Sequence, residues 1–304
     1  MVKEETKALN NAKNDIQLTE ISYSVNTNCS AKDNLDLFIG AYKEFDPPVT
    51  NKAYKIIIGN HDVEFSGTTL EVINCGDKND MLDDMFYSEI YMFKKLIDMN
   101  YPFKEYVGFC HYRKYFSFMD EIPDLDEMFK TYDSIVGKPI ISRAPVKKLY
   151  GICHNIEDLE IVEKIINEKY PYYIKPCNAV LNKNIFIPYN MFIMKRDDFK
   201  KYVEFVWGVL DEYLNIVGRN IFKRIVDNKE KYLKRMSPNN TIEYQYRIGG
   251  YISERLTNIF LVGNFKKMKT YSIVVTEKKY PNEKRAEIKK KIVKEIEKKK
   301  EQAV

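Results

Sequence analysis

Short apolar runs alternate with longer amphipathic stretches along most of this chain. Four runs have the length and the Val, Ile, Phe and Tyr content typical of buried strands, at residues 35–41, 54–59, 106–112 and 134–136. In four longer stretches the apolar residues recur at helical spacing, at residues 80–100, 156–168, 197–214 and 244–258. Strands that alternate with helices predict an α/β domain with a mostly parallel central sheet.

Smaller elements complete this prediction. A short helix is expected near 125–131, and short strands are expected at 185–187 and 191–194, separated by a Pro-Tyr-Asn turn. The apolar run at 259–262 predicts a further strand that closes the core.

The expected domain spans residues 34–265, between a polar extension at 1–33 and a C-terminal extension at 266–304. Within the latter, residues 283–302 have helical propensity, and a narrow apolar stripe lies between lysines at Ile288, Ile292, Val293 and Ile296. Two interpretations of this basic amphipathic helix stay open. It is either a solvated charged helix or an arm that makes peripheral contact with an anionic membrane surface or a partner.

Charge is distributed unevenly along the chain. The formal net charge is +5, and residues 284–300 alone contribute +6, from nine basic and three acidic side chains. Subtracting +6 from +5 leaves about −1 for the remainder. A nucleic-acid-binding domain would carry a basic stripe on its body, so this distribution argues against nucleic acid as a partner.

The five cysteines are odd in number and widely spaced, at positions 29, 75, 110, 153 and 177, and they form no Cys-x-x-Cys pair. This pattern favours reduced thiols in a cytoplasmic protein over a disulfide framework or a zinc site. No apolar run reaches the roughly 18–20 residues of a membrane span, and no signal peptide is visible.

The strand expected at 106–112 ends in His111 and Tyr112, and Arg113 and Lys114 follow it directly. In open α/β sheets, ligands lie just beyond the carboxyl ends of the strands. An imidazole, a guanidinium and an ammonium at such a place suit a phosphate-bearing ligand. The alternative is a surface turn in which Arg113 makes an ordinary salt bridge.

Four segments occur in a fixed order, YVGFCHYRKYF (106–116), YGICHNIEDLEIVEKIINEKYPYY (150–173), NMFIMKRDDFKKY (190–202) and YQYRIGGYISERL (244–256). This order resembles the family catalogued as domain of unknown function 4422. The members of that family are glycosyltransferase-like proteins found among capsular and surface-polysaccharide genes. The resemblance covers residues 35–262. It implies the GT-A glycosyltransferase fold, a single Rossmann-like α/β/α domain that binds a nucleotide-diphosphate sugar.

The resemblance implies a role for each segment on the donor side. Tyr42 and Lys43, which follow the first strand, would lie near the nucleotide base. His111, Arg113 and Lys114 would contact the donor diphosphate.

The segment His111-Tyr112-Arg113 stands where GT-A enzymes carry an Asp-x-Asp metal motif. Mg²⁺ and Mn²⁺ prefer oxygen ligands, and this stretch offers no carboxylate. The sequence therefore names no certain cofactor and assigns no metal ligand, although Mn²⁺ or Mg²⁺ stays open. Arg113 could instead neutralise the leaving diphosphate through bidentate hydrogen bonds, with Lys114 as a second charge.

Two carboxylates are candidates for catalysis. An inverting glycosyl transfer needs a base on the acceptor hydroxyl, usually Asp or Glu. The resemblance points to Glu254, in the helix that often supplies this group, and Asp158 is the second candidate. Structural alternatives stay open for both. Asn155 is a predicted N-cap that places Asp158 in a first helical turn, and Glu254 could form an i,i+7 charge pair with Arg247.

Four residues are candidates for contact with the sugar or the acceptor: His154, Asn190, Arg247 and Gly250. Asn190 equally suits the turn in which it lies. Gly250 follows another glycine within an expected helix, where each glycine costs about 1 kcal/mol relative to alanine. This pair indicates the close approach of a ligand or of a neighbouring backbone.

The expected function is therefore transfer of a sugar from a nucleotide-diphosphate sugar, with a UDP-sugar as the expected donor, to a glycan or lipid-linked acceptor. The alternative, kept open by the missing Asp-x-Asp motif, is a catalytically silent module that binds a nucleotide sugar or a glycan.

Overall fold

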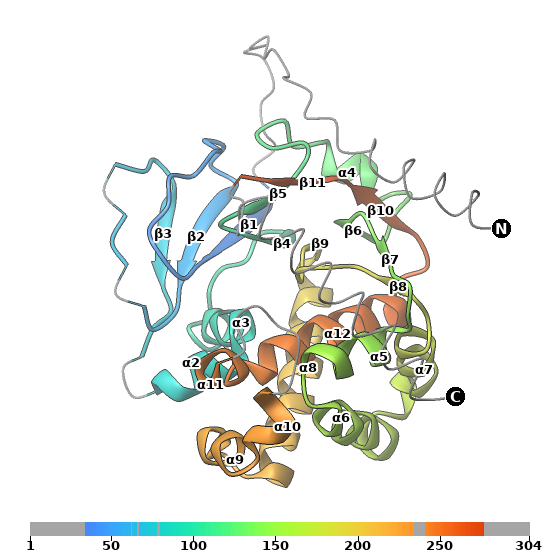
Figure 1. Ribbon diagram of the computed structural model, residues 1–304. Helices are drawn as coiled ribbons and strands as arrows, with labels where there is room; N and C mark the ends of the chain where they lie inside the picture. The colour runs from blue at the N-terminus through green and yellow to red at the C-terminus, as the bar shows by residue number, and fades with distance from the viewer. Residues whose placement is uncertain (1–33, 62, 66, 78–79, 234–240, 277–304) are drawn as a thin grey trace, which may run out of the picture. The chain divides into compact units, whose positions relative to one another are not determined.

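The computed structural model describes residues 34–61, 63–65, 67–77, 80–233 and 241–276. This part of the chain contains a nine-stranded sheet (Figure 1). Seven of its strands follow the order β10-β6-β9-β4-β1-β2-β3, and the other two are β5, which pairs with β4, and β11, which pairs with β5. The strands of this sheet are β1 (Leu35–Ala41), β2 (Tyr54–Ile58), β3 (Glu71–Asn74), β4 (Tyr106–His111), β5 (Lys114–Phe116), β6 (Ser134–Gly137), β9 (Phe192–Lys195), β10 (Met268–Tyr271) and β11 (Ile273–Val275). A separate two-stranded sheet pairs β7 (Ile140–Ile141) with β8 (Ile185–Phe186).

The central sheet is mostly parallel, which confirms the predicted fold class. β1 pairs in parallel with both β2 and β4, β2 with β3, and β10 with β6. β9 runs antiparallel between β4 and β6, and β5 and β11 form antiparallel pairs beside β4.

Helices occupy most of the remaining described chain. They are α2 (Met81–Tyr87), α3 (Glu89–Asp98), α4 (Leu125–Met128), α5 (Val146–Cys153), α6 (Ile156–Lys169), the 3₁₀ turn η2 (Pro171–Tyr173), α7 (Ile174–Leu181), α8 (Arg196–Val217), α9 (Ile221–Asp227), α10 (Lys229–Leu233), α11 (Ile242–Gln245) and α12 (Ile248–Asn264). None of these described helices has both the length and the apolar character that a membrane crossing requires.

The side chains of β1 alternate between two hydrophobic cores. Leu37 and Ile39 belong to one core, and Phe38 belongs to the other. Successive side chains of a strand point to opposite faces of a sheet, so both faces of β1 are buried. Helices α3, α8 and α12 contribute to the core on the Phe38 face, whereas the other core takes in Phe45 and Leu125 of α4.

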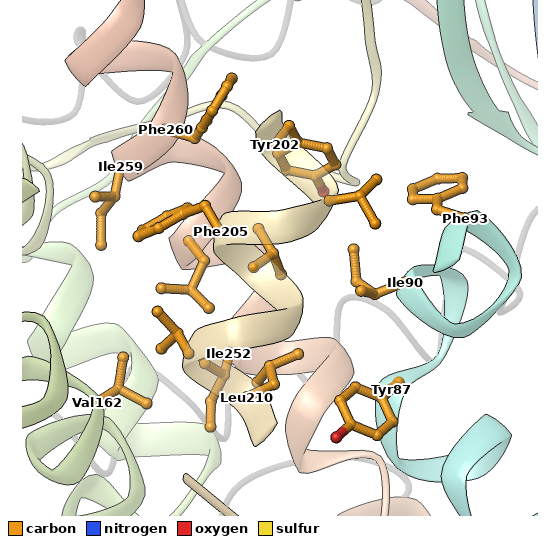
Figure 2. Packing of buried hydrophobic residues seen from close by; sticks show 14 of the residues in the cluster. Tyr87, Ile90, Phe93, Val162, Tyr202, Phe205, Leu210, Ile252, Ile259 and Phe260 are labelled. Atoms are coloured by element: carbon orange, nitrogen blue, oxygen red, sulfur yellow. The ribbon is translucent and has the colours of Figure 1, made fainter. Parts of the chain in front are cut away.

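Helix α8 packs against both α3 and α12. Figure 2 shows its side chains between those of α3 and those of α12. The Tyr202 ring centroid lies 6.5 Å from that of Phe93 on α3 and 5.4 Å from that of Phe260 on α12. Because all three rings are buried, they hold α3 and α12 in a fixed relation on this face.

The helix predicted over 80–100 is divided into two. α2 ends at Tyr87 and α3 begins at Glu89, and between them Ser88 has φ +53° and ψ −130°. A residue other than glycine costs about 1–3 kcal/mol in such a conformation, so tertiary contacts must hold it there. The apolar period continues across the break, which is why the pattern alone predicts one helix.

The strand predicted at 259–262 is wrong, because these residues lie in the last half of α12. Ile259, Phe260 and Leu261 are all buried. A helix buried on most sides gives a continuous apolar run that periodicity cannot distinguish from a strand. The helix predicted over 244–258 also differs at its start. It begins at Ile248, after the separate short helix α11.

The sheet continues beyond residue 265, because β10 pairs with β6 and β11 pairs with β5. The extension predicted at 1–33 and the basic helix predicted at 283–302 lie outside the described residues.

Two glycines let α12 approach the junction between α2 and α3. A Cβ atom on Gly249 would lie 2.5 Å from the carbonyl oxygen of Phe86, and one on Gly250 would lie 2.5 Å from Oγ of Ser88. Of the two explanations left open for this glycine pair, the neighbouring backbone accounts for Gly249.

We expect Gly249→Ala to lower the free energy of unfolding by at least about 1 kcal/mol, measured by urea denaturation. The clash is with backbone, and overpacking of this kind costs about 1–3 kcal/mol even though alanine favours the helix. Gly151→Ala in α5 is the matched control, since its Cβ would lie 3.3 Å from the flexible Ile156 side chain. Equal stability of wild type and Gly249→Ala would contradict this packing argument.

Candidate functional site

The carboxyl ends of β1 and β4 meet at the point where the strand order of the sheet reverses. From β1 the chain continues to β2 on one side and returns later to β4 on the other. Gly40 pairs with His111 in the register, so Tyr42, just after β1, and His111, the last residue of β4, lie at neighbouring strand ends, with ring centroids 6.5 Å apart. Open α/β sheets bind ligands in the crevice at such a switch point. The polar residues around it form the candidate site.

A buried carboxylate, Glu89, lies at the centre of this site. Its Oε2 accepts a hydrogen bond of 3.1 Å from the Tyr42 hydroxyl, and its Oε1 accepts one of 3.0 Å from Nδ2 of Asn190. Nε2 of His111 lies 3.7 Å from Oε1. Glu89 is the first residue of α3, and it thereby connects this helix with the ends of β1 and β4 and with the turn before β9.

Glu89 is ionised in spite of its burial. Burial by itself raises the pKa of this carboxyl, but the contact with His111 and the positive charge of Arg247 outweigh it and lower the pKa to about 2. A buried charge is stabilised only when it is paired and hydrogen-bonded. The contacts of Glu89 supply that compensation.

His111 is mainly uncharged at neutral pH. Burial lowers its pKa, Lys114 and Arg247 lower it further, and the opposing effect of Glu89 is too small to reverse the shift. A neutral imidazole carries one N–H donor and one acceptor nitrogen. At pH 7 His111 therefore provides a polar contact and little positive charge.

Arg247 precedes α12 and faces the same network. Its Nε donates a 3.4 Å hydrogen bond to Oγ of Ser88, and its Cζ lies 5.3 Å from the Tyr42 ring centroid. Burial lowers the pKa of Arg247, but Tyr42 and Glu89 raise it more, so the guanidinium keeps its charge. This cation and the Glu89 carboxylate balance each other within the site.

Glu254 lies on α12, seven residues after Arg247, and its side chain is 26 % exposed. Its Oε2 accepts a 3.1 Å hydrogen bond from Nη1 of Arg255. Burial raises the pKa of Glu254 and the negative charge of Glu89 raises it further, against Arg255, Lys114 and Arg247. A carboxylate with a raised pKa is the stronger base, as general-base catalysis requires.

Cations gather at the turn between β4 and β5. Cζ of Arg113 lies 4.8 Å and Nζ of Lys43 lies 5.6 Å from the centroid of the Tyr112 ring. Nζ of Lys114 lies 3.8 Å from the centroid of the Tyr189 ring. The structure thus brings the predicted diphosphate residues and Lys43 together around two tyrosines.

Asn190 and Gly250 lie beneath this site, within the packed core. Asn190 is buried, and its amide also accepts a hydrogen bond of 2.7 Å from Oγ1 of Thr257 and donates one of 3.1 Å to Oγ of Ser253. Gly250 packs against Ser88. Both residues therefore make close contacts with their neighbours in the core.

His154 lies on an aromatic stack beside α12. Its ring centroid is 4.0 Å from that of Tyr251 and 4.9 Å from that of Tyr150. Tyr251 lies on α12, three residues before Glu254, so the stack connects α5 with the face that carries the candidate base.

Asp158 is held in a different environment. Asn155 caps α6 as predicted, and the fully buried Asp158 Oδ1 accepts hydrogen bonds from Tyr213 (2.8 Å), Tyr232 (3.1 Å) and Arg224 (3.1 Å). Burial raises the pKa of Asp158, and these donors oppose that rise. Among the described residues, these hydrogen bonds connect α6 to α8, α9 and α10, and none of them reaches Glu89.

Sequence reasoning missed Glu89, although a signal was present. Glu89 lies three residues after Phe86 and four before Phe93, on the apolar face of the predicted 80–100 helix. A charged residue on an apolar face needs polar partners, and this one has three, Tyr42, His111 and Asn190.

No group of three or more His, Cys, Asp or Glu residues within the described ranges could hold a metal ion. The four cysteines in those ranges, Cys75, Cys110, Cys153 and Cys177, are free thiols.

Residues 37–266 match the sequence profile of the family described as Domain of unknown function (DUF4422). Among solved structures, the apo structure of the bifunctional glycosyltransferase WbbM is similar, with a TM-score of 0.56 and 18 % sequence identity. The match covers 81 % of this chain and 46 % of that chain, so this chain spans less than half of WbbM, and the likeness concerns the fold. No match was found among curated proteins.

We expect the stability advantage of wild type over Glu89→Gln to depend on pH. The pKa of Glu89 falls from 4.5 to about 2 on folding. The charge therefore stabilises the fold above pH 4.5 by up to about 3 kcal/mol, and this stabilisation is lost as the pH falls toward 2. Urea denaturation at pH 6.5 and 3.5 should show the advantage shrinking by about 1 kcal/mol. Glu160→Gln, at an exposed position of α6, is the control. A stability difference between wild type and Glu89→Gln that stays constant with pH would contradict an ionised Glu89.

Proposed function

The chain belongs to the family of domain of unknown function 4422, and we propose that it transfers a glycosyl group from a nucleotide-diphosphate sugar to a glycan or lipid-linked acceptor. The observation that carries this proposal is the site at the β1 and β4 ends, where cations on one side meet a partly exposed carboxylate of raised pKa on the other. The likeness of the fold to that of a bifunctional glycosyltransferase supports it.

On the donor side, the diphosphate would lie against the turn that follows β4. Arg113 would bind it bidentately and Lys114 would add a second positive charge. Lys43 and Arg113 both contact the Tyr112 ring. Lys43 and the preceding Tyr42 would therefore face the nucleotide. His111, being mainly neutral, would contribute a hydrogen bond rather than a charge.

On the acceptor side, Glu254 would act as the base of an inverting transfer. The acceptor oxygen attacks the anomeric carbon of the donor while its proton passes to the Glu254 carboxylate. The bond between the anomeric carbon and the phosphate oxygen breaks, and the nucleoside diphosphate leaves with the bonding electrons. The cations after β4 would stabilise the charge that develops on this leaving group.

Mn²⁺ or Mg²⁺ would, when bound, supply the same charge stabilisation as a Lewis acid. In this proposal the guanidinium of Arg113 and the ammonium of Lys114 take over that task. The turn after β4 favours this interpretation, because Arg113 and Lys114 offer nitrogen cations there rather than the oxygen ligands that these metals prefer. The nearby Glu89 oxygens already accept hydrogen bonds from Tyr42 and Asn190.

We further propose that a UDP-sugar is the donor, that the acceptor belongs to surface-polysaccharide synthesis, and that the reaction takes place in the cytoplasm. Peripheral membrane contact through the basic C-terminal segment would bring the enzyme to a lipid-linked acceptor.

Incubation with UDP-, GDP- and CMP-sugars, with and without Mn²⁺, tests the donor and the metal. We expect slow release of nucleoside diphosphate from one UDP-sugar, and turnover that persists in EDTA. Donor binding that raises the melting temperature without any hydrolysis would instead favour the silent binding module. The glycosyltransferase proposal fails if no nucleotide sugar changes the melting temperature, and strict dependence on Mn²⁺ would overturn the metal-free interpretation alone.

Variants at the two sides of the site should separate their roles. We expect Arg113→Ala to lower kcat/KM by about 100-fold, since loss of one charge-stabilising group at a leaving anion costs about 10²–10³. Glu254→Gln should lower kcat by about 100-fold or more and leave donor affinity close to wild type, because a base acts on the acceptor.

Arg196→Ala is the matched control for Arg113. Arg196 lies at the amino end of β4, where its side chain donates to the carbonyl oxygen of Phe103. Full activity in Arg113→Ala would contradict the donor assignment. An equal loss of donor affinity and kcat in Glu254→Gln would contradict its assignment as the base.

A further inference from the structure

We propose that Glu89 is a positioning residue whose buried carboxylate orients both the donor side and the acceptor side of the site. This inference rests on the proposed function for its effect on turnover, but its structural part can be tested without any substrate.

Three side chains converge on Glu89 from three different segments, and each can direct an N–H or O–H at it. The Tyr42 hydroxyl comes from the end of β1, the His111 imidazole from the end of β4 and the Asn190 amide from the turn before β9. A carboxylate only accepts hydrogen bonds, so it can serve all three, whereas a glutamine amide would turn an NH₂ group toward one of these donors. The set of partners therefore favours a charged acid at position 89.

On the donor side, Glu89 selects one form of His111. A neutral imidazole whose Nε2 faces a carboxylate carries its proton on that nitrogen. The 3.7 Å approach of Nε2 to Oε1 thus favours the Nε2–H tautomer and one orientation of the ring. Partners of this kind, which orient a group that meets a ligand, commonly change affinity by about 10–100-fold when they are removed.

On the acceptor side, Glu89 acts through Asn190. The Asn190 amide that donates to Glu89 also donates to Oγ of Ser253, the residue before Glu254, and accepts from Oγ1 of Thr257. Asn190 has φ +52°, a left-handed conformation that asparagine tolerates better than most residues. The register of α12 against α3, and with it the place of Glu254, thus depends on this chain of hydrogen bonds.

The backbone around Glu89 is consistent with such a role. Ser88 has a strained positive φ, is buried, and is held by Nε of Arg247 and by the close packing of Gly250. Strain of this kind persists where the surrounding structure over-determines it, and it concentrates at functional sites. A helix that continued unbroken through Ser88 would direct the Glu89 side chain elsewhere.

The proton equilibrium of His111 reports on Glu89 directly. The titratable or charged groups that face this imidazole are Glu89 from α3, Lys114 from β5 and Arg247 at the start of α12. Of these only Glu89 favours the protonated form, so its loss should lower the pKa of His111 further.

The experiment compares wild type with Glu89→Gln, Glu89→Asp and a matched control, Asp36→Asn. Asp36 is also a buried carboxylate on β1, but at its amino end, where it accepts from the backbone N–H of Lys104 (2.9 Å) and faces Nζ of Lys55 (3.3 Å). The chain has three histidines, so NMR titration can follow His111 with His61 and His154 as references. The fluorescence of the single tryptophan, Trp207, which stacks on Tyr87 at 4.0 Å, checks that each variant keeps the α2–α3 junction packed.

In Glu89→Gln we expect a lower His111 pKa, a reduced share of the Nε2–H tautomer, and about tenfold weaker binding of the UDP-sugar identified in the donor panel. Glu89→Asp keeps the charge one methylene further away, and its His111 pKa should lie between those of wild type and Glu89→Gln. Asp36→Asn should lose stability but keep the wild-type His111 titration and donor affinity.

The positioning role is overturned if Glu89→Gln is folded and has the wild-type His111 titration and donor affinity, since Glu89 would then be an ordinary core residue. If wild type binds no nucleotide sugar, the proposed function fails, while the His111 titration still decides whether Glu89 orients that ring. A changed titration with unchanged donor affinity would overturn the donor-side part of the proposal.

Discussion

The site depends on one buried charge, the Glu89 carboxylate, and on the backbone break that places it. An ionised group inside a protein is tolerated only where donors and a countercharge compensate for lost water, and Tyr42, Asn190 and Arg247 do so here. Because these partners come from segments far apart in the chain, the same charge holds strand ends, turn and helix together. Removing one partner weakens this compensation, so stability and site geometry are coupled.

The electrostatics on the two sides of the site are opposite in sign. Around the turn after β4, Arg113 and Lys43 share a tyrosine ring and provide positive charge. On α12, negative charge on Glu89 and burial raise the pKa of Glu254. A leaving diphosphate needs the first environment and a base the second, so the division supports the proposed transfer reaction.

Much of the fold could be predicted from sequence, and the failures have identifiable causes. The β1, β4 and α8 predictions agree with the structure because their apolar patterns match burial along the whole element. The missed break at Ser88 and the false strand at 259–262 share a cause. Apolar periodicity reports which residues are buried, but it does not report a backbone conformation imposed by contacts such as that between Ser88 and Gly250.

The sequence by itself determined the fold class and the polar residues that end and follow β4, because a buried strand with His111, Arg113 and Lys114 at its end is a local pattern. Tertiary structure alone decided which residues share the site. It placed Asn190 in the support of Glu89 and Asp158 among the tyrosines of α8 and α10, and it made Glu89 the centre. The physical reason is that the pairing of a buried charge is a long-range property, set by segments that meet only in the folded chain.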